Sequence, residues 1–128
     1  MTEQDIYKLL ADGERVTLEC KKAQNGVPNS LWETYSAFAN TNGGILLLGV
    51  YENVAEKDSL MRFTITGVED ADKIRKDLWN TINSREKVNV NLLHDEDVQT
   101  ISVNGKEVVA INVPRADYNC VLFTLITT

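Results

Sequence analysis

The stretch Ser36-Ala-Phe-Ala-Asn-Thr-Asn-Gly-Gly-Ile-Leu-Leu-Leu-Gly-Val50 joins a helical pattern directly to a strand pattern. Apolar residues recur at three- and four-residue spacing from 31 to 39, which predicts a helix. Asn42, Gly43 and Gly44 tolerate the positive φ angles at which helices end. The continuous apolar run Ile45–Val50 is typical of a central strand covered on both faces. Gly49 within it indicates that another segment approaches the backbone closely.

Hydrophobic periodicity predicts further elements on both sides of this stretch. Asn104-Gly105 between two β-prone runs predicts a two-residue hairpin turn. The order α-β-α-β-β-α-β-β-β predicts an α+β fold with a mixed β-sheet flanked by helices. The expected elements outside residues 31–50 are a helix over 5–13, strands over 15–21 and 62–65, a helix from 70 or 72 to 82, and strands over 88–92 and on either side of the hairpin turn.

Length and composition indicate one globular domain. The chain has 128 residues, of which 43% are hydrophobic and 25% charged. We expect residues 1–128 to form a single domain, either alone or as the N-terminal part of a longer protein. No apolar run approaches the roughly 18 residues of a membrane span, and the first residues are acidic where a signal peptide is basic. A cytoplasmic location without membrane contact is therefore expected.

The net charge argues against an obvious nucleic-acid binder. Thirteen Lys and Arg against nineteen Asp and Glu leave −6, which does not attract a phosphate backbone. Residues 73–87 are the local exception, with five basic against two acidic side chains. This segment is either a modest phosphate-binding patch or a solvated helix face.

Cysteine, histidine and glycine patterns exclude several kinds of site. Cys20 and Cys120 are too far apart in sequence for a metal knuckle and are expected to be reduced. His94 is the single histidine, so multi-histidine metal sites are excluded. The chain has no phosphate-loop or dinucleotide-binding glycine motif. No cofactor is therefore expected.

Three carboxylates are arranged so that they could share a metal ion. Glu14 and Glu19 flank the first predicted strand, and Glu52 follows the central one. If the three converge, they could bind Mg²⁺ or Mn²⁺, because hard cations take oxygen ligands. Lys21 projects from the same strand face as Glu19, about 7 Å away, so the charges equally fit a solvated sheet face.

The C-terminal run Val121–Ile126 is apolar, β-prone and uncharged. Such a segment aggregates unless it is covered. It is expected either to complete the sheet or to form a homodimer interface.

Several motifs together resemble a known family. They are Glu14-x4-Glu19-x-Lys21, the stretch Ser36–Val50, and Val113-Pro-Arg-Ala116. They are similar to the Schlafen/Alba-type DNA-binding domain found at the N-terminus of bacterial transcriptional regulators, and the match runs from about Glu14 to Ala116. The resemblance implies an Alba-like α+β fold and binding of nucleic acid, with DNA favoured.

The resemblance also implies which residues would act. Candidate phosphate contacts are Lys21, Lys22, Lys73, Arg75, Lys76 and Arg115. The alternative function is a metal-dependent, Schlafen-type ribonuclease in which Glu14, Glu19 and Glu52 bind Mg²⁺ or Mn²⁺ as the catalytic site. A binding module is favoured over an enzyme. The turn Tyr51-Glu52-Asn53 departs from the Asp-rich turn of the family, and residues 117–128 replace its usual polar, basic segment.

Overall fold

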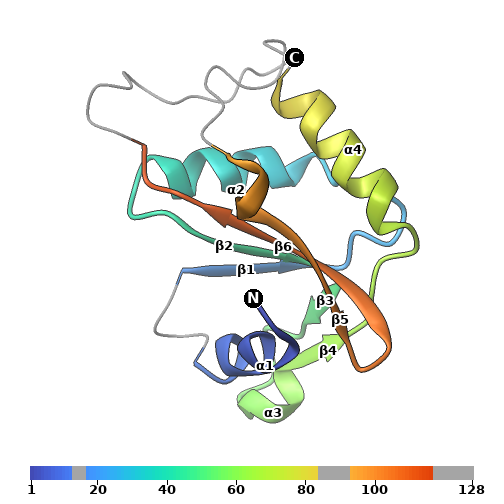
Figure 1. Ribbon diagram of the computed structural model, residues 1–128. Helices are drawn as coiled ribbons and strands as arrows, with labels where there is room; N and C mark the ends of the chain where they lie inside the picture. Colours follow the sequence, from blue (N-terminus) through green and yellow to red (C-terminus); the bar gives the residue numbers. More distant parts are fainter. Residues whose placement is uncertain (13–16, 84–92, 117–128) are drawn as a thin grey trace.

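The computed structural model describes residues 1–12, 17–83 and 93–116 of the chain (Figure 1). Its elements, in chain order, are α1 (Glu3–Ala11), β1 (Leu18–Lys21), α2 (Ser30–Ala39), β2 (Gly44–Leu48), β3 (Val50–Glu52), α3 (Ser59–Arg62), β4 (Phe63–Ile65), α4 (Ala71–Ile82), the 3₁₀ turn η1 (Asp95–Asp97), β5 (Val98–Val103) and β6 (Lys106–Val113).

The main sheet has four strands in the order β1-β2-β6-β5. β1 runs parallel to β2, whereas β6 is antiparallel to both β2 and β5. β3 and β4 form a separate antiparallel pair in which Tyr51 lies opposite Thr64. The sheet is therefore mixed, as the α+β prediction requires.

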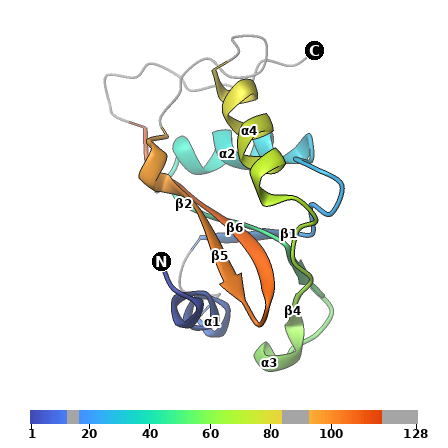
Figure 2. The ribbon, with the colours of Figure 1, turned by 45° about the vertical axis from the view of Figure 1, so that its right-hand side comes forward.

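Helices cover both faces of the main sheet. α2 and α4 lie on one face, and α1, α3 and the β3–β4 pair lie on the other (Figures 1 and 2). Alternation along the strands divides the core accordingly: Leu46 and Leu48 pack with α2 and α4, whereas Leu47 packs with Ile6 and Leu10 of α1. This explains the unbroken apolar run in β2, because both of its faces are buried.

Local signals set several element boundaries. Asp70 caps α4, since its carboxylate accepts a hydrogen bond from the Lys73 N–H at 3.1 Å. Thr2 and Asp5 form a capping box at the start of α1. Asn104 and Gly105 have φ angles of 51° and 75° and form the predicted two-residue turn between β5 and β6.

The predicted single strand Ile45–Val50 is wrong in one respect, because the chain leaves the main sheet at Gly49. There φ is +100°, and a Cβ would lie 3.0 Å from the Gly67 carbonyl carbon and 3.1 Å from the Glu107 oxygen. The backbone turns sharply and enters β3, so one apolar run supplies strands of two sheets. The close approach inferred from Gly49 is confirmed, and its partners are Gly67 and Glu107.

The remaining predictions have mixed outcomes. The α+β class with a mixed sheet and flanking helices is confirmed, and α3 is an additional short helix. Helix α1 ends at Ala11, before the predicted stop at Gly13. The predicted strand over 88–92 and the run Val121–Ile126 lie outside the described residues. No helix in the described part of the chain is long and apolar enough to cross a membrane.

Candidate nucleic-acid interface

Two of the motifs that carry the resemblance, distant in sequence, meet at one end of the sheet. The Ala116 N–H donates to the Ala39 carbonyl at 2.8 Å. A Cβ placed on Gly43 would lie 2.6 Å from the Val113 oxygen and 3.1 Å from the Arg115 nitrogen. The loop after α2 and the segment after β6 are thus in direct backbone contact, and only glycine fits between them.

Hydrogen bonds to the end of α2 hold this loop in place. The Gly43 N–H donates to the Phe38 carbonyl at 2.8 Å, and the Thr41 hydroxyl donates to the Ala37 carbonyl at 2.9 Å. Gly43 has φ +78°, so the predicted glycine end of the helix is confirmed. These bonds satisfy carbonyls that the last helical turn leaves unpaired.

The surface over this contact is polar and carries an exposed arginine. Asn40, Thr41 and Asn42 are exposed and uncharged, and Arg115 beside them is exposed. Arg115 forms no ion pair with any residue that the structure describes. We call residues 40–43 with 113–116 the motif surface. The exposed Arg115 guanidinium can bind an anion, and the residues beside it are uncharged and do not repel that anion.

The cations predicted on α4 have different environments. Arg75 is partly buried, and its Nη1 donates to the Val98 carbonyl at 2.7 Å, which ties α4 to the sheet. Lys76 and Lys73 are exposed. Lys73 lines a hollow of about 490 Å³ together with the loop 24–26 and the acidic pair Glu69 and Asp70. The predicted patch over 73–87 therefore contributes two exposed lysines in its described part.

Lys21 and Lys22 lie at the opposite end of the sheet from Arg115. Lys21 is opposite Leu48 at the end of β2, whereas Val113 is opposite Gly44 at its start, about 13 Å away along the strand. The Lys21 ammonium contacts the Ser30 hydroxyl at 3.1 Å and a Glu19 carboxylate oxygen at 3.9 Å. The ammonium of Lys22 lies 5.2 Å from the centre of the Tyr51 ring. The six predicted cations do not form one patch.

The two described carboxylates of the predicted metal site are already paired. Glu52 accepts from the Arg62 Nε at 2.7 Å, and Glu19 contacts Lys21. Glu14 lies outside the described residues. Within 1–12, 17–83 and 93–116, no group of three His, Cys, Asp or Glu side chains is placed to hold a metal. The three-carboxylate nuclease site stays a prediction.

A partly buried thiol, that of Cys20, senses the charges of these carboxylates. Burial, together with the negative charges of Glu52 and Glu19, raises the pKa of Cys20 to about 12. Cys20 is free in the structure, as predicted, and packs against the α1 face of the core. A thiol with so high a pKa is protonated at neutral pH, which fits a structural role.

The motifs in this arrangement can be compared with known proteins. The sequence profile of the Schlafen AlbA_2 family matches residues 14–123. The chain belongs to this family. The match includes both segments of the motif surface, so the resemblance seen in the sequence is confirmed. None of the curated proteins matches the chain.

Solved structures show the same AlbA_2 fold. One is the N-terminal domain of a protein described as related to the ATP-dependent DNA helicase RecG, from Nitrosomonas europaea. It is 30% identical with a TM-score of 0.77, and the match covers 100% of this chain and 82% of that one. A second is the DIP2311 protein of Corynebacterium diphtheriae, at 24% identity and a TM-score of 0.53. That match covers 88% of this chain and 22% of DIP2311, and shows the fold alone.

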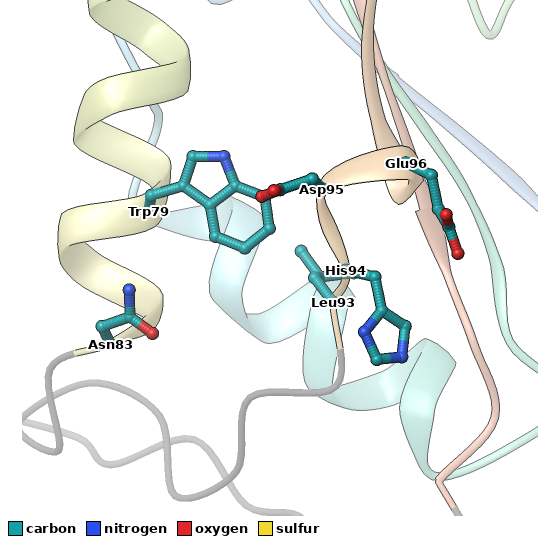
Figure 3. Close-up of a pocket in the computed structure, with 6 residues that line it drawn as sticks. All are labelled: Trp79, Asn83, Leu93, His94, Asp95 and Glu96. Carbon is teal, nitrogen blue, oxygen red and sulfur yellow. The ribbon is translucent and has the colours of Figure 1, made fainter.

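An open hollow of this AlbA_2 domain was not anticipated from the sequence. It has a volume of about 730 Å³ and lies between the end of α4 and η1 (Figure 3). The Trp79 ring extends from α4 toward Asp95, and Asn83, Leu93, His94 and Glu96 complete its described lining. That lining has two carboxylates and no Lys or Arg. The described lining therefore does not favour phosphate, and we do not include it in the proposed interface.

Proposed function

We propose that this AlbA_2 domain is a nucleic-acid-binding module and that its ligand is DNA. Two comparisons support the proposal: membership of the Schlafen AlbA_2 family, and a structural match over the whole chain to the N-terminal domain of a protein described as DNA-helicase-related. DNA is favoured over RNA because the name of this neighbour refers to DNA.

The observation that carries the proposal is the motif surface. Both of its segments belong to the family match, and the fold brings them together around an exposed arginine without an ion pair in the described structure. Arg115 presents a guanidinium suited to phosphate, and the exposed Asn42 supplies an amide of the kind that commonly binds phosphate or sugar. Because the protein has a net charge of −6, its contacts with DNA phosphates must be few and confined to a local surface.

Binding to mixed-sequence duplex DNA tests the proposal. At about 50 mM salt, the wild-type domain is expected to bind below roughly 100 μM, the range of non-specific binders. Arg115→Gln is expected to weaken binding about 3- to 10-fold, because one phosphate contact is lost. Fluorescence anisotropy with a labelled duplex measures both affinities.

Lys8→Gln is the matched control for that experiment. Lys8 is an exposed residue of α1, which lies on the other face of the sheet from α2, and its loss changes the net charge by the same amount. Equal weakening by the two variants would show that total charge, and not the motif surface, governs binding. Absence of association for the wild-type domain at low salt would overturn the proposal itself.

The finer role that we propose is regulation of transcription. A regulator must prefer particular DNA sequences, and such preference requires contacts to base edges in addition to phosphates. The exposed amide of Asn42 can supply such a contact, because an asparagine side chain pairs bidentately with adenine. Selection from a random duplex library is expected to enrich a defined sequence. A pool without enrichment would show that the domain binds DNA non-specifically.

A homodimer through Val121–Ile126 stays a prediction for residues outside the described structure.

A further inference from the structure

The β3–β4 pair has an inner and an outer face of different character. On the inner face, Val50, Phe63 and Ile65 pack against the α1 side of the core. On the outer face, Tyr51 and Thr64 lie directly opposite each other and are exposed, with 43% of Tyr51 accessible. A large aromatic ring is therefore held in solvent by two strands whose other side is anchored in the core.

A lysine lies at each side of this pair. Val108 packs against the α1 side of the core, so Lys106, two residues away in β6, projects toward that side of the sheet. Lys22 directly follows the last residue of β1, and its contact with the Tyr51 ring places it beside β3. Both lysines are exposed. The Lys22 ammonium lies 5.2 Å from the Tyr51 ring centre, and Lys106 Nζ donates to the Ile65 carbonyl at 3.3 Å.

Nearby carboxylates do not cancel these charges. Glu52 is the one carboxylate within β3 and β4, and it is paired with Arg62 at 2.7 Å. Glu107, the neighbour of Lys106, projects to the opposite side of the sheet, because Val109 two residues on packs with α2 and α4. Although the protein is acidic overall, Lys22, Tyr51, Thr64 and Lys106 form a strip of surface with a local positive charge. We call it the β3–β4 strip.

We propose that the β3–β4 strip binds an unpaired base of single-stranded nucleic acid by stacking on Tyr51, with Lys22 and Lys106 contacting the flanking phosphates. This inference rests on the proposed function and names the form of its ligand. A positively charged surface with an exposed aromatic ring is how proteins hold single strands without sequence preference. Bases inside a duplex are already stacked and offer no free face to the ring. Single strands, or duplexes with single-stranded extensions, are therefore the preferred substrates at this strip.

The test compares a labelled single strand of about 12 nucleotides with a blunt duplex of the same length. Tyr51→Ala is expected to weaken single-strand binding about 5- to 150-fold, the range for the loss of one stacked base. The same variant leaves duplex affinity within about twofold, because the motif surface lies elsewhere. Tyr51→Phe retains the ring and is expected to bind like the wild type.

Tyr7→Ala is the matched control, because Tyr7 is also exposed, at 48%, and lies on α1 outside the strip. Circular dichroism melting confirms that each variant is folded, and Lys22→Gln supplies a second route if Tyr51→Ala unfolds. Loss of single-strand affinity confined to strip variants supports the inference. Unchanged single-strand affinity, or equal loss on both substrates, overturns it while duplex binding still supports the proposed function. If neither substrate binds the wild type, both proposals fail.

Discussion

Gly43→Ala is expected to lower the free energy of unfolding by about 3 kcal/mol. Two costs add at this position. The φ angle of +78° is one that alanine adopts with strain, and the added Cβ would lie 2.6 Å from the Val113 oxygen. That oxygen belongs to the backbone of β6, so the clash cannot be relieved by a side-chain rotation. Urea denaturation followed by tryptophan fluorescence measures the loss.

Gly105→Ala separates the two costs. Its φ angle of +75° nearly equals that of Gly43, yet a Cβ there would meet nothing within 4 Å. Backbone strain alone is expected to lower the free energy of unfolding of this variant by about 1 kcal/mol. Equal losses in the two variants would contradict the close contact between the loop after α2 and the end of β6, on which the motif surface depends.

Cys20 is expected to react with a thiol reagent about a hundredfold more slowly in the folded protein than in urea at pH 8. Burial and the charges of Glu52 and Glu19 raise its pKa to about 12, so the thiolate is scarce. The greater intrinsic reactivity of a more basic thiolate offsets part of this scarcity. Cys120→Ser leaves Cys20 as the one thiol in the chain, and absorbance with Ellman's reagent then gives the rate. Comparable rates in the two states would show that Cys20 is accessible.

The same pKa predicts how stability depends on alkaline pH. Because the pKa is raised on folding from an ordinary value of 9.0, folding favours the protonated thiol. Its contribution is fully present below pH 9 and is lost as the pH rises toward 12. The Cys20→Ala variant lacks this contribution. Between pH 9 and 12 its free energy of unfolding is therefore expected to fall less than that of the wild-type protein.

Local sequence signals predicted the helices and turns well. The periodicity of α2 and α4, the Asp70 cap and the Asn104-Gly105 turn depend on residues close in sequence, and each is present in the structure. The α+β class followed from their order. Such features need no knowledge of distant contacts, which is why the sequence was sufficient for them.

The point at which the chain leaves the main sheet, Gly49, depends on contacts that are distant in sequence, and the hydrophobic pattern does not predict it. The run Ile45–Val50 is apolar beyond the end of β2 because Val50 is buried as fully as Leu46, Leu47 and Leu48. What divides the run is the approach of Gly67 and Glu107, which are distant in sequence. A glycine within an apolar run was the one available signal.

The candidate site was predicted in its residue types but not in its arrangement. The sequence predicts Arg115 as a phosphate contact, which stays a prediction, and the structure leaves this residue exposed on the motif surface. Arg75 has the same charge, yet its guanidinium is engaged by the Val98 carbonyl. Tyr51 was seen only as part of a turn, because its exposure depends on β4 pairing beside it. Sequence shows which side chains are charged or aromatic, and the fold decides which remain available.

The salt dependence of duplex DNA binding tests the central claim most directly. If the motif surface binds phosphates, affinity falls between about 50 and 200 mM salt, and the slope of log K against log salt reports the number of phosphates contacted. Arg115→Gln is expected to reduce this slope by about 1, because one phosphate contact is removed. A slope that is the same in the wild type and in Arg115→Gln would contradict the account.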